Sequence, residues 1–159
     1  MNKLVDERTE WPGSRCSVAS ALDVVGTRSA LLLMREAFMG TRRFDDFAER
    51  VGIGEPAAAA RLKELVAAGL LVRVPYQEPG QRTRYEYQLT EKGTQLLPVI
   101  TALREWGDRW ETGDRGPSVL ARHRDCGATV HTRLRCEADH EVLAGEIELV
   151  PGPGAMVDA

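Results

Sequence analysis

Residues 43–90 read RFDDFAERVGIGEPAAAARLKELVAAGLLVRVPYQEPGQRTRYEYQLT. Within this stretch, apolar side chains recur three and four positions apart over residues 43–51 and again over residues 55–68, which predicts two short helices. The Gly-Ile-Gly turn between them is tight, and Pro56 stands in the first turn of the second helix, where its missing N–H removes no hydrogen bond. Two helices joined in this way are typical of a helix-turn-helix.

The second half of the same stretch predicts a β-hairpin. The apolar run 70–74 is followed by the turn-rich residues 75–80, and then by the alternating Tyr85, Tyr87 and Leu89. A hairpin in this place is a wing, so the expected fold is mainly α with a small β component (α+β), a winged helix-turn-helix. In that arrangement the second helix enters the major groove of DNA and the wing contacts the phosphates.

Helices are also expected on both sides of this motif. Apolar periodicity predicts helices over residues 16–25 and 28–39, each followed by a glycine that ends it. After the hairpin, Thr90 is expected to cap one long helix from Glu91 to about Glu111. The winged motif would then end in a long C-terminal helix.

Three regions are expected along the chain. Residues 1–15 form an N-terminal arm, residues 16–111 the DNA-binding and dimerisation domain, and residues 112–159 a β-rich, zinc-knuckle-like extension. In this extension, strand-like patterns at 128–134 and 146–150 predict a small C-terminal β-hairpin appendix.

The predicted DNA-binding surface is local, because the whole chain carries a net charge of −3. Residues 42–84 contain eight basic and six acidic side chains, and basic ones gather at the start of the first helix, midway along the second and at the hairpin tip. The second helix offers few hydrogen-bond donors, so its alanines would pack on thymine methyl groups while Arg61 contacts guanine or phosphate. The residues predicted to contact DNA are Arg42, Arg43, Glu55, Ala57, Ala58, Ala60, Arg61, Lys63, Arg82 and Arg84.

An alternative interpretation of the alanine-rich helix stays open. Alanine has the highest helix propensity, so the same segment suits a winged-helix adaptor that binds proteins and has lost DNA binding. Binding to duplex DNA distinguishes the two, because affinity that depends on phosphate contacts falls as salt rises.

Several classes of protein are not expected. The longest apolar run, residues 30–34, is far shorter than the ~20 residues that span a bilayer. Residues 1–11 lack the apolar stretch of a secretory signal, which favours the cytoplasm and no membrane partner. The chain has no phosphate-cradling glycine loop, HExxH motif or nucleophile elbow, so an enzyme is not predicted.

Eight short motifs, in order along the chain, resemble the HxlR-type winged-helix regulators of bacteria, within the broad MarR-like superfamily. The motifs are CSVA (16–19), ALDVVG (21–26), LLLMRE (31–36), RRFDDF (42–47), RLKEL (61–65), GLL (69–71), YEYQLT (85–90) and EKG (91–93). The resemblance implies a homodimeric repressor or activator that binds a double-stranded DNA operator and responds in some cases to a small-molecule effector. The chain departs from the family where Ser17 replaces a usual proline and where alanines replace polar residues of the recognition helix.

The apolar stripe of the long helix supports the dimer independently. It carries two tryptophans and several leucines, which is more apolar surface than one small domain readily covers. The alternatives are a helix packed wholly within its own monomer, or a ligand pocket against the C-terminal hairpin lined by its tryptophans. The residues predicted at the dimer interface are Val18, Leu22, Leu96, Val99, Ile100, Leu103, Trp106 and Trp110.

The three cysteines are too few for a disulfide framework. In some members of the family that this chain resembles, the cysteine at the position of Cys16 senses electrophiles or oxidants. A helix N-terminus favours the reactive thiolate form, which makes Cys16 a candidate redox sensor. The alternative is a cysteine at a helix start that has no role in signalling.

Two pairs in the C-terminal extension are spaced like zinc knuckles, His123-x-x-Cys126 and Cys136-x-x-Asp139. Two residues between ligands let a tight turn direct both side chains at one tetrahedral metal. Longer members of the family look similar here but have a second cysteine where this chain has Asp139, so the fourth ligand would be Asp139 or the adjacent His140. A hairpin without stoichiometric zinc is the favoured interpretation, and no other cofactor is expected.

Overall fold

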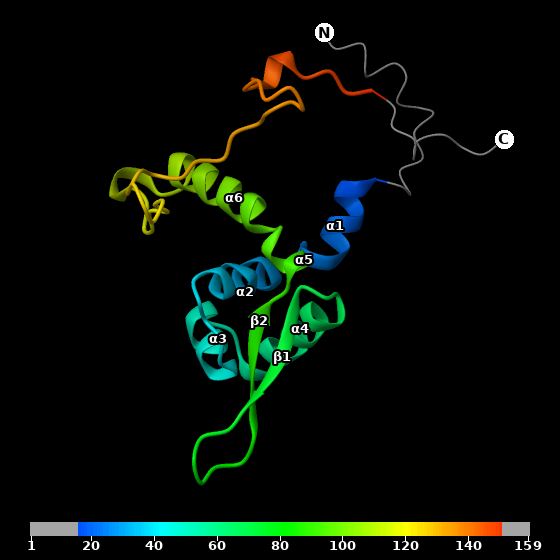
Figure 1. Ribbon diagram of the computed structural model, residues 1–159, viewed down its shortest axis with the longest axis vertical. Helices are drawn as coiled ribbons and strands as arrows, with labels where there is room; N and C mark the ends of the chain where they lie inside the picture. Colours follow the sequence, from blue (N-terminus) through cyan, green and yellow to red (C-terminus); the bar gives the residue numbers. More distant parts are fainter. Residues whose placement is uncertain (1–15, 151–159) are drawn as a thin grey trace, which may run out of the picture. The chain divides into compact units, whose positions relative to one another are not determined.

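The computed structural model describes residues 16–150, so the predicted arm at residues 1–15 lies outside the described residues (Figure 1). The chain divides into two compact units, one of residues 24–132 and another that includes the described residues 16–23 and 133–150. The fold is mainly helical with one two-stranded antiparallel sheet, as the sequence predicts. No single described helix is long and apolar enough to cross a membrane. The helices, strands and 3-10 turns are α1 (Ser17–Val25), α2 (Arg28–Phe38), α3 (Phe44–Val51), α4 (Glu55–Ala67), β1 (Leu71–Tyr76), β2 (Arg84–Leu89), α5 (Glu91–Thr94), α6 (Leu97–Trp110), η4 (Gly113–Arg115) and η5 (Ala144–Glu146).

Helices α2, α3 and α4 surround the core of the unit formed by residues 24–132 (Figure 1). The largest fully buried side chains come from these helices and from the first residue of β1: Phe47, Leu33, Met34, Leu62, Leu65 and Leu71. Helix α2 begins after Thr27, whose hydroxyl accepts a hydrogen bond from the Ala30 N–H at 3.2 Å. Helix α3 ends at Gly52, whose φ of 70° lets the chain turn into α4. Helices α3 and α4 are therefore the predicted helix-turn-helix.

Strands β1 and β2 and the loop between them form a hairpin, residues 71–89, which we call the wing. The base of the wing is held against the helices, because the ring of Tyr87 packs edge-on against buried Phe47 with 6.0 Å between centroids. The Tyr87 N–H also donates to the carbonyl of Arg42 at 2.8 Å. The loop end projects beyond the helices (Figure 1), so the wing is fixed at its base and open at its tip.

The prediction of one long helix over residues 91–111 is wrong, because the structure has two helices, α5 and α6. Thr90 caps α5 as predicted, and its hydroxyl accepts the N–H of Gly93 at 3.0 Å. The helix stops after Thr94 because Pro98 has no N–H to donate to the Thr94 carbonyl. Pro98 lies instead in the first turn of α6, where no such donor is needed.

Helix α5 is fastened to the end of α4. The ammonium group of Lys92 donates to the Ala68 carbonyl at 2.8 Å, and the Thr90 N–H donates to the Leu70 carbonyl at 3.1 Å. The backbones approach so closely that a Cβ added to Gly93 would lie 2.1 Å from the Leu70 oxygen. Only glycine fits there, and the start of α6 is thereby tied to the C-terminal end of α4.

The predicted strands over residues 128–134 and 146–150 are wrong, since the described part of the extension has isolated bridges and 3-10 turns instead. The bridged pairs are Arg122 with Thr129 and Arg135 with Glu141. In each loop a residue with left-handed backbone, Gly127 (φ 71°) or Asp139 (φ 65°), reverses the chain tightly. In each loop the two chain segments separate after one bridged pair, so neither loop forms a pair of hydrogen-bonded strands.

Candidate nucleic-acid interface

Helix α4 presents its first two turns to solvent. Glu55, Ala57 and Ala60 are exposed, as a DNA-contacting surface requires, but they offer few hydrogen-bond donors. Ala58 is completely buried, so the prediction of a DNA contact for Ala58 is wrong. It stands one turn before buried Leu62 and therefore lies on the core face of the helix.

The two cations midway along α4 differ in their surroundings. The guanidinium of Arg61 forms an ion pair with Glu64 on the same helix, and its side chain is only 29% exposed. Lys63 is exposed and has no ion pair within residues 16–150. Lys63 is therefore available to a phosphate, whereas Arg61 reaches DNA only by leaving Glu64.

Arg42 and Arg43, at the start of α3, are ion-paired with carboxylates of the wing. Arg42 Nη1 lies 3.5 Å from Glu86 Oε1, and Arg43 Nη2 lies 2.9 Å from Glu78 Oε1. The hydrogen bond to Glu78 raises the pKa of Arg43 above its usual value. The Arg43 guanidinium also lies over the ring of Tyr76, at 5.1 Å from the centroid. Both arginines thus join α3 to the wing, and a phosphate would compete with these carboxylates for them.

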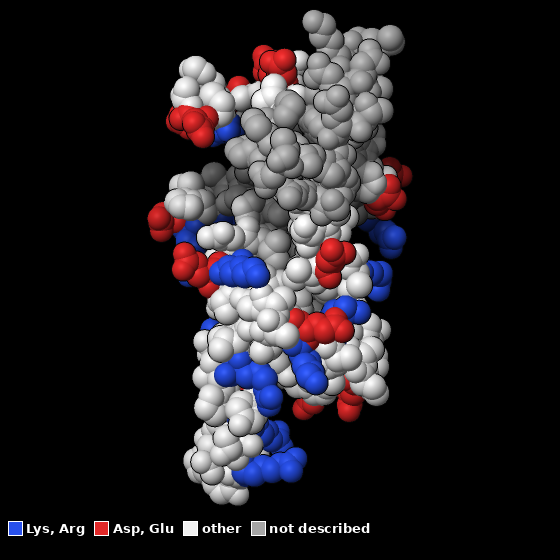
Figure 2. Space-filling model, turned by 90° about the vertical axis from the view of Figure 1, so that its right-hand side faces the viewer, with Lys and Arg blue, Asp and Glu red and all other residues white. Residues whose placement is uncertain are grey.

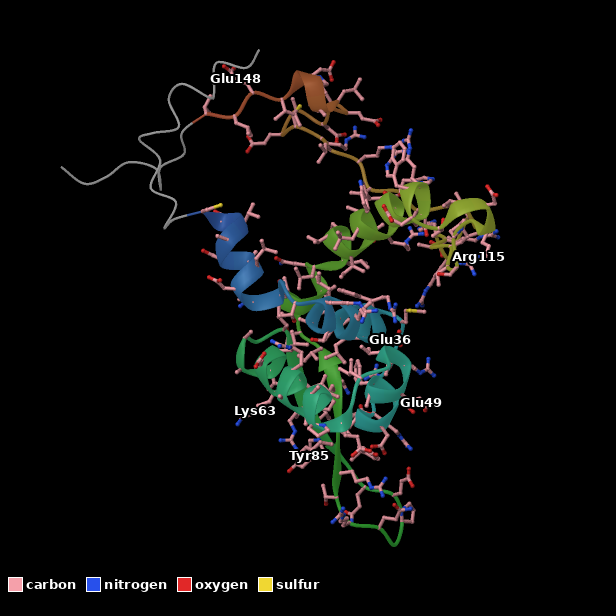
Figure 3. All side chains as sticks on the ribbon, turned by 180° about the vertical axis from the view of Figure 1, so that it is seen from behind. Glu36, Glu49, Lys63, Tyr85, Arg115 and Glu148 are labelled. Carbon is pink, nitrogen blue, oxygen red and sulfur yellow. The ribbon has the colours of Figure 1, made fainter. Side chains whose placement is uncertain are left out.

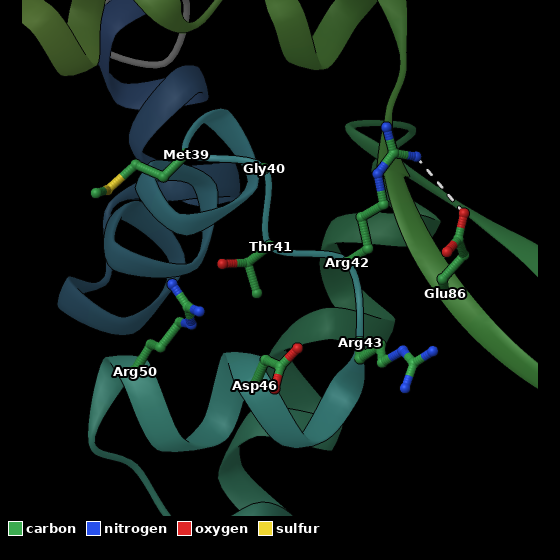
Figure 4. A pocket seen from close by; sticks show the side chains of 8 residues that line it. All are labelled: Met39, Gly40, Thr41, Arg42, Arg43, Asp46, Arg50 and Glu86. Atoms are coloured by element: carbon green, nitrogen blue, oxygen red, sulfur yellow. Dashed lines mark ion pairs between the residues drawn. The ribbon is translucent and has the colours of Figure 1, made fainter.

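A polar pocket of about 260 Å³ lies between α3, the turn before it and β2 (Figure 4). Thr41 lines it and donates its hydroxyl hydrogen to buried Glu36 at 3.0 Å. Arg50 also lines it, is exposed and has no ion pair in the described part of the chain. The sequence does not single out Arg50, because on sequence alone it is one of several charges on a solvated helix face. The lining residues are Met39, Gly40, Thr41, Arg42, Arg43, Asp46, Arg50 and Glu86.

Exposed cations continue from the helices to the tip of the wing, and Figure 2 shows Lys and Arg side chains along this part of the molecule. Arg82 and Arg84 are exposed and have no ion pair among the residues that the structure describes. Arg73 of β1 lies over the ring of Tyr85, with its Cζ 4.1 Å from the centroid. The sequence shows Arg73 as a basic residue, but its partner is visible only once the register of the hairpin is known.

Helix α6 leaves most of its apolar side chains open to solvent and contains no buried residue. The predicted interface residues of α6 with side chains 47–63% exposed are Val99, Leu103, Trp106 and Trp110. Leu96 and Ile100 instead pack against the core, so part of their apolar surface is used within the monomer. On α1, Val18 and Leu22 are exposed as well.

The segment after α6 is held to this helix by two charged side chains. Arg104 Nη1 donates to the Val119 carbonyl at 3.1 Å. One oxygen of Glu105 accepts the Thr132 N–H at 3.0 Å, and the other lies 2.7 Å from His131 Nδ1. Partial burial by itself raises the pKa of Glu105, but the hydrogen bonds from Thr132 and His131 outweigh it, so the pKa lies below its usual value.

The side chains predicted to bind zinc or to sense oxidants are at the surface. All three cysteines are free and exposed: Cys16, Cys126 and Cys136. In the first predicted knuckle His123 Nδ1 lies 3.2 Å from Cys126 Sγ. In the second, Asp139 is ion-paired with Arg135 at 2.6 Å. Within residues 16–150 no three His, Cys, Asp or Glu side chains are grouped to hold a metal. The favoured interpretation, a hairpin without stoichiometric zinc, stays a prediction.

A helix-turn-helix with an exposed second helix, followed by a two-stranded wing with arginines at its tip, defines a winged helix-turn-helix protein. Residues 24–115 match the family described as HxlR-like helix-turn-helix, and the chain belongs to this family. The protein is therefore a transcriptional regulator with a helix-turn-helix domain.

Similar proteins cover most of the chain. Rv3095 of Mycobacterium tuberculosis, named as an uncharacterised HTH-type transcriptional regulator, is 42% identical over 139 residues, which are 87% of each chain. The crystal structure of PA1607, a proposed transcription factor, has a TM-score of 0.77 and 33% identity and covers 88% of this chain and 97% of its own. The redox regulator HypR in its reduced form has a TM-score of 0.54 and 30% identity, over 59% of this chain and 92% of its own.

Proposed function

We propose that the protein is a homodimer that binds a duplex DNA operator and represses transcription. Helix α4 enters the major groove and the wing lies on the phosphate backbone. The observation that carries this proposal is the exposed surface of α4 beside a wing whose tip bears Arg82 and Arg84, both without ion pairs in the described structure. Lys63 adds an available cation on α4 itself. Cations on the backbone and a helix in the groove are complementary to duplex DNA.

The proposal of a dimer depends on the exposed surface of α6. Its exposed large apolar side chains are Leu97, Val99, Leu103, Trp106 and Trp110, and soluble monomers rarely leave a surface of this kind uncovered. We take the partner to be a second copy of the chain, because the resemblance to HxlR-type regulators implies a homodimer. A two-fold dimer would place two α4 helices in successive major grooves, about 34 Å apart.

The test is a titration of a labelled mixed-sequence duplex with the full chain at increasing salt. Affinity should fall steeply as salt rises, because phosphate contacts release counterions. Arg82→Gln should weaken binding to every DNA sequence by about threefold to tenfold, whereas Arg61→Ala should weaken binding chiefly to a preferred sequence. Arg115→Gln, the control, removes the same charge from the turn after α6 and should change DNA binding little. A protein that retains no duplex at low salt would overturn the proposal.

An adaptor that binds protein instead of DNA is the second candidate. The observation in its favour is α4 alone, whose exposed start is rich in alanine and whose Arg61 is engaged by Glu64. The adaptor predicts no salt-dependent retention of duplex DNA in the same titration.

We also propose that an oxidant or electrophile acts through Cys16. This thiol is exposed at the start of α1, and the similar fold of HypR belongs to a redox regulator. Hydrogen peroxide should change DNA binding by the wild-type protein and not by Cys16→Ser, which should still bind DNA. Cys126→Ser is the matched control, and an equal response in Cys16→Ser would remove the proposal.

A further inference from the structure

One cation–aromatic pair of the wing lies beside α4. In the register of the hairpin, Arg73 is opposite Tyr87 and Tyr85 is opposite Pro75, so all four share one face of the wing. That face is the one on which Tyr87 packs against the core, and β1 contacts α4. Figure 3 shows Tyr85 below the helices and Lys63 on the flank of α4. The pair of Arg73 and Tyr85 therefore continues the surface of α4 onto the wing.

Arg73 differs from the other arginines of this surface in what holds it. Arg43 and Arg61 are held by carboxylates, which occupy their N–H groups. Arg73 is held by the ring of Tyr85 and has no ion pair within residues 16–150. Stacking uses the flat face of a guanidinium and leaves its in-plane N–H donors free.

The pair is also ready to bind without rearrangement. The Tyr85 side chain is 46% exposed and Arg73 is exposed, so both are accessible to a large partner. An arginine already fixed by its neighbour loses less conformational entropy when it forms hydrogen bonds. Its planar donors match the two acceptors that guanine presents in the major groove, O6 and N7.

We infer that the Arg73–Tyr85 pair reads a guanine of the operator next to the bases covered by α4. It supplies the directional donors that the alanines of α4 lack. This inference rests on the proposed function, since it names how the same DNA-binding surface obtains its specificity. Tyr85 is a positioning residue, and Arg73 makes the contact.

The experiment uses two duplexes, one that the wild-type chain recovers from a random-sequence pool and one unrelated mixed sequence. Arg73→Lys keeps the charge and loses the planar donors, so it should bind the recovered duplex about tenfold more weakly and the unrelated duplex nearly as well as the wild type. Tyr85→Leu should have a similar effect, and Tyr85→Phe, which keeps the ring, should have none. Combining Arg73→Lys with Tyr85→Leu should add little to either change, because both remove one contact.

Two further measurements locate the contact. Replacing one G·C pair of the recovered duplex should weaken binding by the wild-type protein and leave binding by the Arg73→Lys variant unchanged. Arg115→Lys, the same change in the turn after α6, should bind both duplexes like the wild type.

Equal binding by Arg73→Lys and the wild type would overturn the inference, as would an equal loss on both duplexes. If the wild-type chain recovers no duplex at all, the proposed function itself fails, which is a different result. Thermal unfolding should be unchanged in each variant because both side chains are exposed.

Discussion

The core around α2, α3 and α4 and the helix α6 use large apolar side chains in opposite ways. Phe47 and Leu33 of the core have no exposed surface, whereas Trp106 and Trp110 of α6 are 58% and 63% exposed. Full burial of such a side chain contributes about 1.5–3 kcal/mol. The core gains this free energy within one chain, whereas in the proposed dimer α6 would gain it from a second copy of the chain. Folding and the proposed assembly would then depend on different parts of the molecule, joined through α5.

The largest expected effect is at that junction. Gly93→Ala would place a methyl group 2.1 Å from the Leu70 oxygen, so α5 must move away from the end of α4. We expect the free energy of unfolding to fall by about 3 kcal/mol, as for other changes that strain a buried backbone contact. Chemical denaturation measures it.

Gly107→Ala is the control for that change. Gly107 lies inside α6, and an added Cβ there meets nothing within 4 Å. Because alanine favours helix more than glycine does, this variant should be as stable as the wild type or more stable by up to about 1 kcal/mol. Equal stability of the two variants would show that α5 does not fasten α6 to the core.

A smaller effect is expected on assembly. Trp106→Ser removes a large exposed side chain of α6 and should weaken the proposed dimer by about 2 kcal/mol, close to thirtyfold in the dissociation constant. Its thermal unfolding in the monomeric state should match that of the wild type. Sedimentation equilibrium measures the change.

Met39→Ser is the matched control, because Met39 is exposed to a similar extent, 54%, but lies at the end of α2. It should leave the dimer intact. An unchanged monomer–dimer equilibrium in Trp106→Ser would remove α6 from the interface.

The helices and the wing were predictable because their signals are local. The three-and-four spacing of apolar residues and the turn at Gly52 lie within a few residues of the elements they determine. The break before α6 also had a local signal, Pro98, but the apolar spacing continues across it and led to one helix in the prediction. Ala58 was misplaced because alanine occurs on both the buried and the exposed faces of α4.

The remaining features depend on residues far apart in the chain. Arg43 and Glu78 are separated by thirty-five positions, and their pairing follows from how the wing is placed against α3. The stacking of Arg73 on Tyr85 follows from the register of the hairpin. In the extension, alternating side chains predicted strands, but alternation does not show whether a partner strand is present.

The smallest expected effect tests whether the segment after α6 stabilises the fold through its contacts with this helix. Glu105 is the candidate, since its carboxylate accepts hydrogen bonds from the Thr132 N–H and from the ring N–H of His131. Glu105→Gln should lower the free energy of unfolding at pH 7 by less than about 1 kcal/mol, as for partly exposed charged contacts. In the unfolded chain the carboxyl has its ordinary pKa, 4.5, and in the folded chain the pKa is lower.

The extra free energy of unfolding of the wild type over Glu105→Gln should therefore be complete above pH 4.5. It should disappear as the pH falls through the lower pKa of the folded state. Denaturation of both proteins from pH 7 to pH 3 measures the difference. His131→Ala keeps the Thr132 hydrogen bond and should lose only part of the advantage. A difference that persists at acid pH would mean that the neutral carboxyl holds Thr132 and His131 better than an amide of the same shape does. Hydrogen-bond geometry, and not charge, would then hold the segment after α6 to the helix.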